Sequence, residues 1–160
     1  MVDVGDDAPD FTASLVTDEM APFRLTDHLG DGPVVLAFFP AAFSGTCTDE
    51  MRAFRDGTDE FGEETTVLGV STDLPHALRR YREEYDLPFP LVADPDHHGI
   101  EAYDVVAAFE RYGVEVVAQR AVFVIDTDGT VTYRWLAENP GQEPDYDALV
   151  DAIPESTASD

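Results

Sequence analysis

The stretch VVLAFFPAAFSGTCTDEMRAF, residues 34–54, changes its pattern halfway along. Residues 34–39 form a continuous apolar run with the length of a buried β-strand, and residues 48–61 then space their large apolar side chains as one face of a helix. Between these two patterns lies Cys47, the single cysteine of the 160 residues. The sequence therefore predicts a strand, a short loop and a helix, with a thiol where the helix begins.

The same alternation continues along the chain. Residues 66–71 read as a second buried strand and residues 74–85 as an amphipathic helix. A strand, a helix and a strand in this order predict a parallel βαβ unit with a right-handed crossover. Residues 121–126 and 130–135 flank a turn and predict a β-hairpin, and residues 143–153 predict a last helix. We expect an α/β protein in which helices cover both faces of a mixed central sheet.

Length and composition indicate one domain. A chain of 160 residues, 44% of them hydrophobic, can bury a sizeable core. We expect this domain to cover residues 1–153 and to be followed by a flexible tail at 154–160. The start of the sequence lacks the pattern of a signal peptide, and its longest apolar runs fall short of the ~20 residues that cross a bilayer. These features favour a cytoplasmic protein without a membrane segment.

The charge excludes one class of partner. The sequence holds 34 acidic residues against 9 basic ones, all of them arginine, for a formal net charge of -25. Nucleic-acid phosphates would be repelled by such a surface. The acid suits either a cationic partner or very high salt, and we favour salt because its ions screen the repulsion among carboxylates. The composition therefore predicts a halophilic protein.

The position of Cys47 favours a reactive thiol. Ser44, Gly45 and Thr46 offer turn and N-cap chemistry, which predicts a helix that begins beside the sulfur. Free N–H groups and the positive end of the helix dipole favour a thiolate over a thiol. An inert buried cysteine would be expected in mid-strand or on the apolar face of a helix.

Several thiol chemistries fit poorly. A thiol–disulfide oxidoreductase carries C-x-x-C, but Glu50 occupies the second cysteine position. A phosphatase loop requires arginine after five intervening residues, and Arg52 comes one residue too early. A cysteine hydrolase needs a histidine base, and none of the four histidines lies in a recognisable signature. Attack on a peroxide is the chemistry that remains favoured.

The residues around Cys47 resemble those of a known family. FFPAAFSGTCTDE resembles the P-x-x-x-[ST]-x-x-C loop of the peroxiredoxins, the alkyl hydroperoxide reductase and thiol-specific antioxidant type, with Pro40, Ser44 and Cys47 at the motif positions. GDDAPDF, VLGVSTD, PFPLVADPD and RAVFVIDTDGTV resemble other blocks of that family in the same order. The resemblance covers roughly residues 4–150. It implies a thioredoxin-like fold and an antioxidant peroxidase that reduces hydrogen peroxide or organic hydroperoxides through a sulfenic acid on the redox-active Cys47.

The resemblance also implies how the peroxide is held. In the family a hydroxyl, the cysteine N–H and a distant arginine bind the two oxygens, which carries over to Ser44, Cys47 and Arg120. Such donors stabilise the negative charge that develops on the leaving oxygen. Arg120 immediately precedes an apolar run, where it is either this site arginine or a residue of a surface ion pair.

Three further residues complete the predicted site, Pro40 among the catalytic residues and Thr46 and Glu50 in support. Pro40 shields the sulfur from water in the implied site, although a proline also simply ends a strand. Glu50 matches the acid of the family's C-x-x-E, or else is a solvated helix carboxylate. Thr46 is placed with Glu50 among the residues that support substrate binding. The resemblance implies no cofactor and no metal site.

Two departures from the family pattern concern the mechanism. Ser44 stands where many relatives have threonine, which keeps the hydroxyl. Arg52 stands where the bacterioferritin-comigratory subfamily often has a second cysteine. The chain therefore resembles one-Cys members such as the alkyl hydroperoxide reductase E type. The segment at 139–145 also resembles that type. The sulfenic acid must then be reduced by an external thiol or a thioredoxin- or glutaredoxin-like protein.

The sequence leaves other interpretations open. The same Cys47 would serve a redox sensor that signals through a mixed disulfide, or it could be an inert thiol in a structural scaffold. A homodimer, the preferred peroxide, the physiological reductant and the balance between sensing and detoxification are undecided.

Overall fold

The computed structural model describes residues 2–62, 64–109, 112–139 and 142–153, with only the backbone at 58 and 59. The expected tail at 154–160 and the middle of the segment at 139–145 lie outside these residues.

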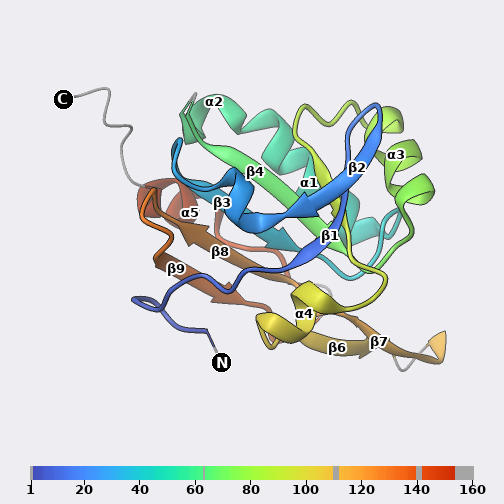
Figure 1. Ribbon diagram of the computed structural model, residues 1–160. Coiled ribbons are helices and arrows are strands. Elements are labelled where there is room, and N and C mark those ends of the chain that lie inside the picture. Colours follow the sequence, from blue (N-terminus) through green and yellow to red (C-terminus); the bar gives the residue numbers. More distant parts are fainter. Residues whose placement is uncertain (1, 63, 110–111, 140–141, 154–160) are drawn as a thin grey trace.

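A seven-stranded sheet forms the centre of the molecule, with strand order β2-β1-β5-β4-β3-β8-β9 (Figure 1). Its strands are β1 (Thr12–Val16), β2 (Met20–Arg24), β3 (Val34–Phe38), β4 (Thr66–Ser71), β5 (Leu91–Ala93), β8 (Ala121–Ile125) and β9 (Val131–Leu136). A separate antiparallel ribbon consists of β6 (Val106–Phe109) and β7 (Val114–Ala118).

The pairing of the strands confirms the predicted mixed sheet. β3 runs parallel to β4, and β4 runs parallel to β5. β8 pairs antiparallel with β3 and with β9, so the βαβ unit and the hairpin are both present. Because Phe38 at the end of β3 lies opposite Ala121 at the start of β8, the loop after β3 and the residue before β8 are brought together.

Helices cover both faces of this sheet. They are α1 (Gly45–Asp56), α2 (Thr58–Phe61), α3 (Pro75–Glu84), α4 (His98–Ala102) and α5 (Tyr146–Ala152), with a 3-10 turn η1 (Leu25–His28). Side chains from α1, α2, α3 and α5 pack in one apolar core, and those from α4 and η1 in a second. Val35 and Ala37 of β3 face the first core, whereas Val34 and Leu36 face the second. Figure 1 draws α4 with the β6–β7 ribbon at the lower edge, apart from α1, α2 and α3.

The predicted helix at 48–61 is wrong in its bounds. α1 begins three residues earlier, at Gly45, and ends at Asp56. Gly57 separates it from α2 and donates its N–H to the Ala53 carbonyl at 3.0 Å. Glycine is a poor residue for a helix interior and a common one at a helix end, which explains the break.

The last helix is also shorter than predicted. Asp145 accepts a hydrogen bond from the Ala148 N–H at 3.1 Å and so caps α5, which starts at Tyr146 rather than at 143. The sequence analysis did not predict β1, β2, β5, β6, β7 or α4. β2 contains Pro22, which argues against a strand, but β2 lies at the sheet edge, where a missing N–H is tolerated.

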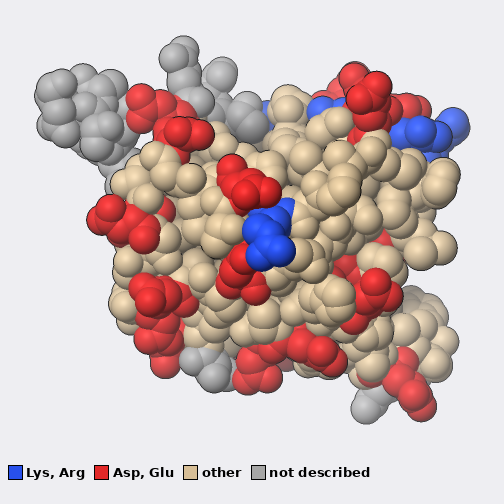
Figure 2. All heavy atoms as spheres, viewed as in Figure 1, with Lys and Arg blue, Asp and Glu red and all other residues tan. Residues whose placement is uncertain are grey.

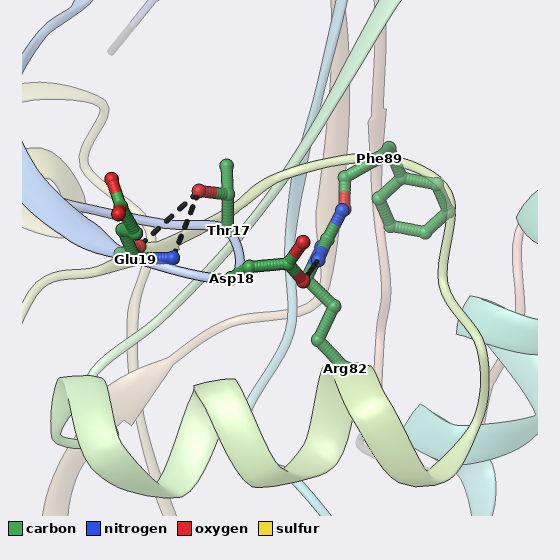
Figure 3. Close-up of polar contacts among 5 residues, drawn as sticks. All are labelled: Thr17, Asp18, Glu19, Arg82 and Phe89. Carbon is green, nitrogen blue, oxygen red and sulfur yellow. Dashed lines mark hydrogen bonds and ion pairs between the residues drawn. The ribbon is translucent and has the colours of Figure 1, made fainter.

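Arg82 on α3 makes hydrogen bonds to two loops (Figure 3). Its Nη1 donates at 3.1 Å to Oδ1 of Asp18, which lies in the turn between β1 and β2. Its Nε donates to the Phe89 carbonyl at 3.0 Å. The arginine thus holds α3 over the β1–β5 side of the sheet.

Acidic side chains are spread over the face drawn in Figure 2, with few basic ones between them. Within the described part of the chain, no helix is both long and apolar enough to cross a bilayer.

Candidate active site

Cys47 lies in the first turn of α1, directly after the loop at 40–44 that leaves β3. The backbone N–H groups of this turn have no partner further back in the helix, because the first bond is made by Thr48 N–H to the Ser44 carbonyl at 2.9 Å. The sulfur therefore lies at the positive end of the helix. The side chain is fully buried.

Ser44 is the N-cap of α1 by its extended backbone, but its side chain makes no capping hydrogen bond. The expectation of side-chain capping at this position is therefore wrong. Its half-buried hydroxyl is not engaged by the helix end, so it remains available to a ligand beside Cys47.

Arg120 reaches the sulfur from the far end of the chain. Its Nη2 donates to Cys47 Sγ at 3.2 Å, and its carbonyl accepts the Ala137 N–H at 2.9 Å, which fixes its backbone against the end of β9. Only 2% of the residue is exposed, so the interpretation as a surface ion pair is wrong. The pairing of β3 with β8 explains this placement.

Glu50 lies one helical turn after Cys47. Arg120 Nη1 donates to Glu50 Oε1 at 2.6 Å, and Glu50 is fully buried, so the interpretation as a solvated carboxylate is wrong. Its second oxygen, Oε2, has no hydrogen-bond partner among the described residues. We call Cys47, Glu50 and Arg120 the thiol cluster.

Burial decides the electrostatics of the thiol cluster. Loss of solvent raises the pKa of Glu50 to about 7, although the charge of Arg120 acts in the opposite direction. Burial also opposes the charged form of Arg120, but the neighbouring Glu50 and Cys47 outweigh it and raise the pKa of the guanidinium. The permanently charged guanidinium of Arg120 therefore interacts with two acidic groups, the Cys47 thiol and the Glu50 carboxyl.

The remaining predicted site residues lie at the border of the cluster. Pro40 is buried and, with Arg120, lines a cavity of about 320 Å³ to which residues of the β6–β7 ribbon contribute another wall. Thr46 is half-buried beside Cys47, and its side chain makes no hydrogen bond with the described residues. The structure thus brings Pro40 to the cluster but gives Thr46 no defined contact.

One anchoring residue escaped the sequence analysis. Asp73 Oδ2 accepts the Ala42 N–H at 2.8 Å and the Ser71 hydroxyl at 2.7 Å, so it ties the loop at 40–44 to the end of β4. Asp73 ends the VLGVSTD block, but that block carries no local signal for a contact with a loop 31 residues earlier.

The arrangement suits attack by a thiolate. The guanidinium and the helix end both favour negative charge on sulfur, and the same donors can stabilise charge on a leaving oxygen. No group of three or more histidine, cysteine, aspartate or glutamate side chains in the described residues is placed to bind a metal ion. A thiol held against a buried arginine at the start of a helix is the arrangement expected for a thiol-dependent peroxidase.

Comparison with known proteins agrees with this class. Residues 4–134 match the model of the AhpC/TSA family. Peroxiredoxin Bcp of Bacillus subtilis is 32% identical over 136 residues, which cover 84% of this chain and 85% of the relative. Alkyl hydroperoxide reductase E of Mycobacterium bovis is 31% identical over 163 residues, which cover 99% of this chain and 100% of the relative. The crystal structure of peroxidoxin BcpB from Mycobacterium tuberculosis superposes with a TM-score of 0.82 at 31% identity, over 95% of this chain and 96% of that one.

The chain therefore belongs to the AhpC/TSA family and is a peroxiredoxin, an enzyme that reduces peroxides at the expense of thiols. Its single cysteine fits the one-Cys form of that mechanism.

Proposed function

We propose that the chain reduces hydroperoxides through a Cys47 sulfenic acid, with Ser44, Arg120 and the Cys47 N–H holding the two oxygens. The observation that carries this proposal is the 3.2 Å hydrogen bond from Arg120 to the buried sulfur. It supplies a charge beside the nucleophile without requiring a general base.

The first half-reaction consumes the peroxide. The Cys47 thiolate attacks one oxygen, the O–O bond breaks, and the other oxygen takes up a proton and leaves as water or an alcohol. Sulfur loses two electrons to become a sulfenic acid, and the peroxide gains them. In the second half-reaction one external thiol forms a mixed disulfide and releases water, and another thiol then frees Cys47.

The other residues have supporting roles in this proposal. Glu50 orients Arg120, because the 2.6 Å bond fixes one side of the guanidinium while the other side faces sulfur. Pro40 keeps water away from the sulfur. Thr46 contributes a backbone N–H to the helix end beside the substrate.

The cavity of about 320 Å³ supports an organic hydroperoxide as one substrate. It meets the thiol cluster at Arg120, and its other walls include the apolar side chains of Val106, Phe109 and Val117. Such walls favour an alkyl or aryl group over water.

The environment and partners are also proposed. A sulfenic acid without a second cysteine requires external reductant, which supports a reducing compartment such as the cytoplasm and a thioredoxin- or glutaredoxin-like partner. The net charge of -25 supports a high-salt setting. Exposed Phe43 and Leu74 are compatible with a homodimer.

Intact-mass analysis tests the reaction directly. One equivalent of hydrogen peroxide should add one oxygen to the monomer, a small thiol should convert this species to a mixed disulfide, and excess thiol should restore the starting mass. Cys47→Ser should show none of these changes. A covalent dimer that forms before any oxygen adduct would contradict external reduction, and a stable mixed disulfide without turnover would favour the redox sensor.

A further inference from the structure

Tyr81, in the middle of α3, is fully buried in the same apolar core as Cys47, yet the proposed chemistry does not use it. Its hydroxyl donates to Thr48 Oγ1 at 3.2 Å. Its ring packs edge-on against Phe43, with the ring centroids 4.9 Å apart, and lies 6.1 Å from the ring of Phe39. One side chain therefore contacts the loop and the helix that carry the site.

The three residues that Tyr81 contacts are all next to proposed site residues in the sequence. The neighbouring pairs are 39/40, 43/44 and 47/48. Tyr81 thus contacts the residue next to each of the three motif residues Pro40, Ser44 and Cys47. A change in the position of this ring would move all three motif residues relative to one another.

The loop needs such support because it is strained. Phe43 has φ +67°, a left-handed conformation that costs a residue with a side chain about 1 kcal/mol and persists only where surrounding contacts hold it. Phe43 is 47% exposed, so burial alone does not hold it, and its ring lies against those of Tyr81 and Tyr85. Asp73 holds the preceding residue, Ala42, through the backbone.

The hydroxyl of Tyr81 acts on the helix rather than on the loop. Thr48 is buried, and its N–H makes the first helical bond, to the Ser44 carbonyl. Burial raises the pKa of Tyr81, so the hydroxyl stays protonated and donates a hydrogen bond instead of acting as an acid. The contact therefore fixes the residue immediately after the nucleophile.

We propose that Tyr81 is a positioning residue for peroxide reduction, which holds the loop and the first turn of α1 so that the Ser44 hydroxyl and the Cys47 sulfur face the same pair of oxygens. The inference rests on the proposed function of Cys47. It assigns to Tyr81 the geometry of the site and not the charge on the thiol.

Single-turnover oxidation by hydrogen peroxide, followed by stopped flow, tests the hydroxyl. Tyr81→Phe keeps the ring but removes the hydroxyl. It should slow oxidation about 3- to 10-fold, the factor in rate that corresponds to the free energy of one hydrogen bond. Thr48→Val should slow it by the same factor. The double variant should be no slower than either single one, because both changes remove the same interaction.

Tyr81→Leu tests the ring and adds a second readout. Loss of the ring contacts should slow oxidation by peroxide about 100-fold, since small displacements of reacting groups are costly. Alkylation of Cys47 by iodoacetamide should become faster, because a loosened loop exposes a sulfur that is otherwise fully buried. Opposite changes in the two rates indicate lost positioning, whereas parallel changes would overturn the inference.

Tyr103→Phe is the matched control. Tyr103 is also buried and donates to the Pro9 carbonyl at 2.8 Å, but in the second core. Its loss should lower the melting temperature and leave both rates at the wild-type values. Equal slowing by Tyr103→Phe, or a wild-type rate in Tyr81→Phe, would overturn the role of Tyr81. A wild-type chain that peroxide does not oxidise would overturn the proposed function, and this inference with it.

Discussion

Arg120 interacts with two acidic groups at once, the sulfur of Cys47 on one side and the carboxyl of Glu50 on the other. A lysine could not replace it, because only a planar guanidinium offers parallel donors in two directions. The proposed peroxide would add a third partner. The effect of removing this side chain is therefore a direct measure of the site's electrostatics.

Arg120→Met should slow oxidation of Cys47 by peroxide about 10- to 1000-fold, because a donor and a positive charge are lost together. Stopped-flow measurement of single-turnover oxidation by hydrogen peroxide gives this rate. Arg134→Met, which removes a partly exposed arginine paired with Asp3, is the control and should leave the rate unchanged. A wild-type rate in Arg120→Met would contradict the role assigned to the guanidinium.

Glu50→Gln should change the dependence of stability on pH. The pKa of Glu50 is raised from 4.5 to about 7 in the folded chain. Between these values the unfolded chain has lost the Glu50 proton while the folded chain keeps it, so the wild-type free energy of unfolding falls as pH rises. Glutamine lacks this contribution, and the variant should gain roughly 3 kcal/mol relative to wild type across that interval.

Urea unfolding at fixed salt measures this difference. The gain should be absent below pH 4.5 and constant above about pH 7. Glu101→Gln, at an exposed position of α4, controls for the loss of one carboxyl group. A difference between Glu50→Gln and wild type that does not vary with pH would mean that Arg120 keeps Glu50 ionised throughout.

The residues of the candidate site differ in how far the sequence predicts them. Pro40, Ser44 and Cys47 lie in one short stretch, so their spacing is visible. Arg120 could be assigned only by resemblance, because no local pattern indicates which distant residue a folded sheet brings to a thiol. Asp73 and Tyr81 were missed since single hydrogen bonds between elements leave no periodic signal.

At the level of elements, β3, β4, β8 and β9 were predicted within a residue of their ends, because each is a compact apolar run. No compact apolar run marks β1, β2 or β7, which are partly exposed and include polar residues, and β5, β6 and α4 have only three to five residues. The contacts of Arg82 with Asp18 and with the Phe89 carbonyl could not be predicted from the sequence either, because they depend on a single side chain.

Arg82→Met should lower the free energy of unfolding by about 1–2 kcal/mol, because the Phe89 carbonyl loses a partly buried donor. Asp18→Asn should have a much smaller effect, since the Asp18 side chain is 93% exposed and its ion pair is weakened by solvent. Chemical denaturation of both variants compares the two contacts. Equal losses of stability in the two variants would mean that the ion pair with Asp18, and not the bond to the Phe89 carbonyl, stabilises this part of the fold.

For the whole molecule, the acidic surface predicts a strong effect of salt. Dilution into low salt should lower the melting temperature, because repulsion among carboxylates is no longer screened. A loss of about 2 kcal/mol would correspond to roughly 4–8 °C for a chain of this size. A melting temperature that does not respond to sodium chloride would contradict a halophilic protein.

The shape of the salt curve separates two causes. Screening is nearly complete at about 1 M salt, where the Debye length is ~3 Å. In a kosmotropic salt such as sodium sulfate, strengthened burial of apolar groups continues to grow beyond that concentration. A rise in melting temperature confined to the lower range would therefore identify repulsion among surface charges as the cause.

The distance along the chain between Cys47 and Arg120 also has a consequence during synthesis. Arg120 leaves the ribosome 73 residues after Cys47, an interval of ~4–15 s at ordinary rates of translation. Throughout that time the nascent chain carries a cysteine without its guanidinium and without β8 beside β3. The contact that the proposed reaction requires therefore forms only after most of the chain has been made.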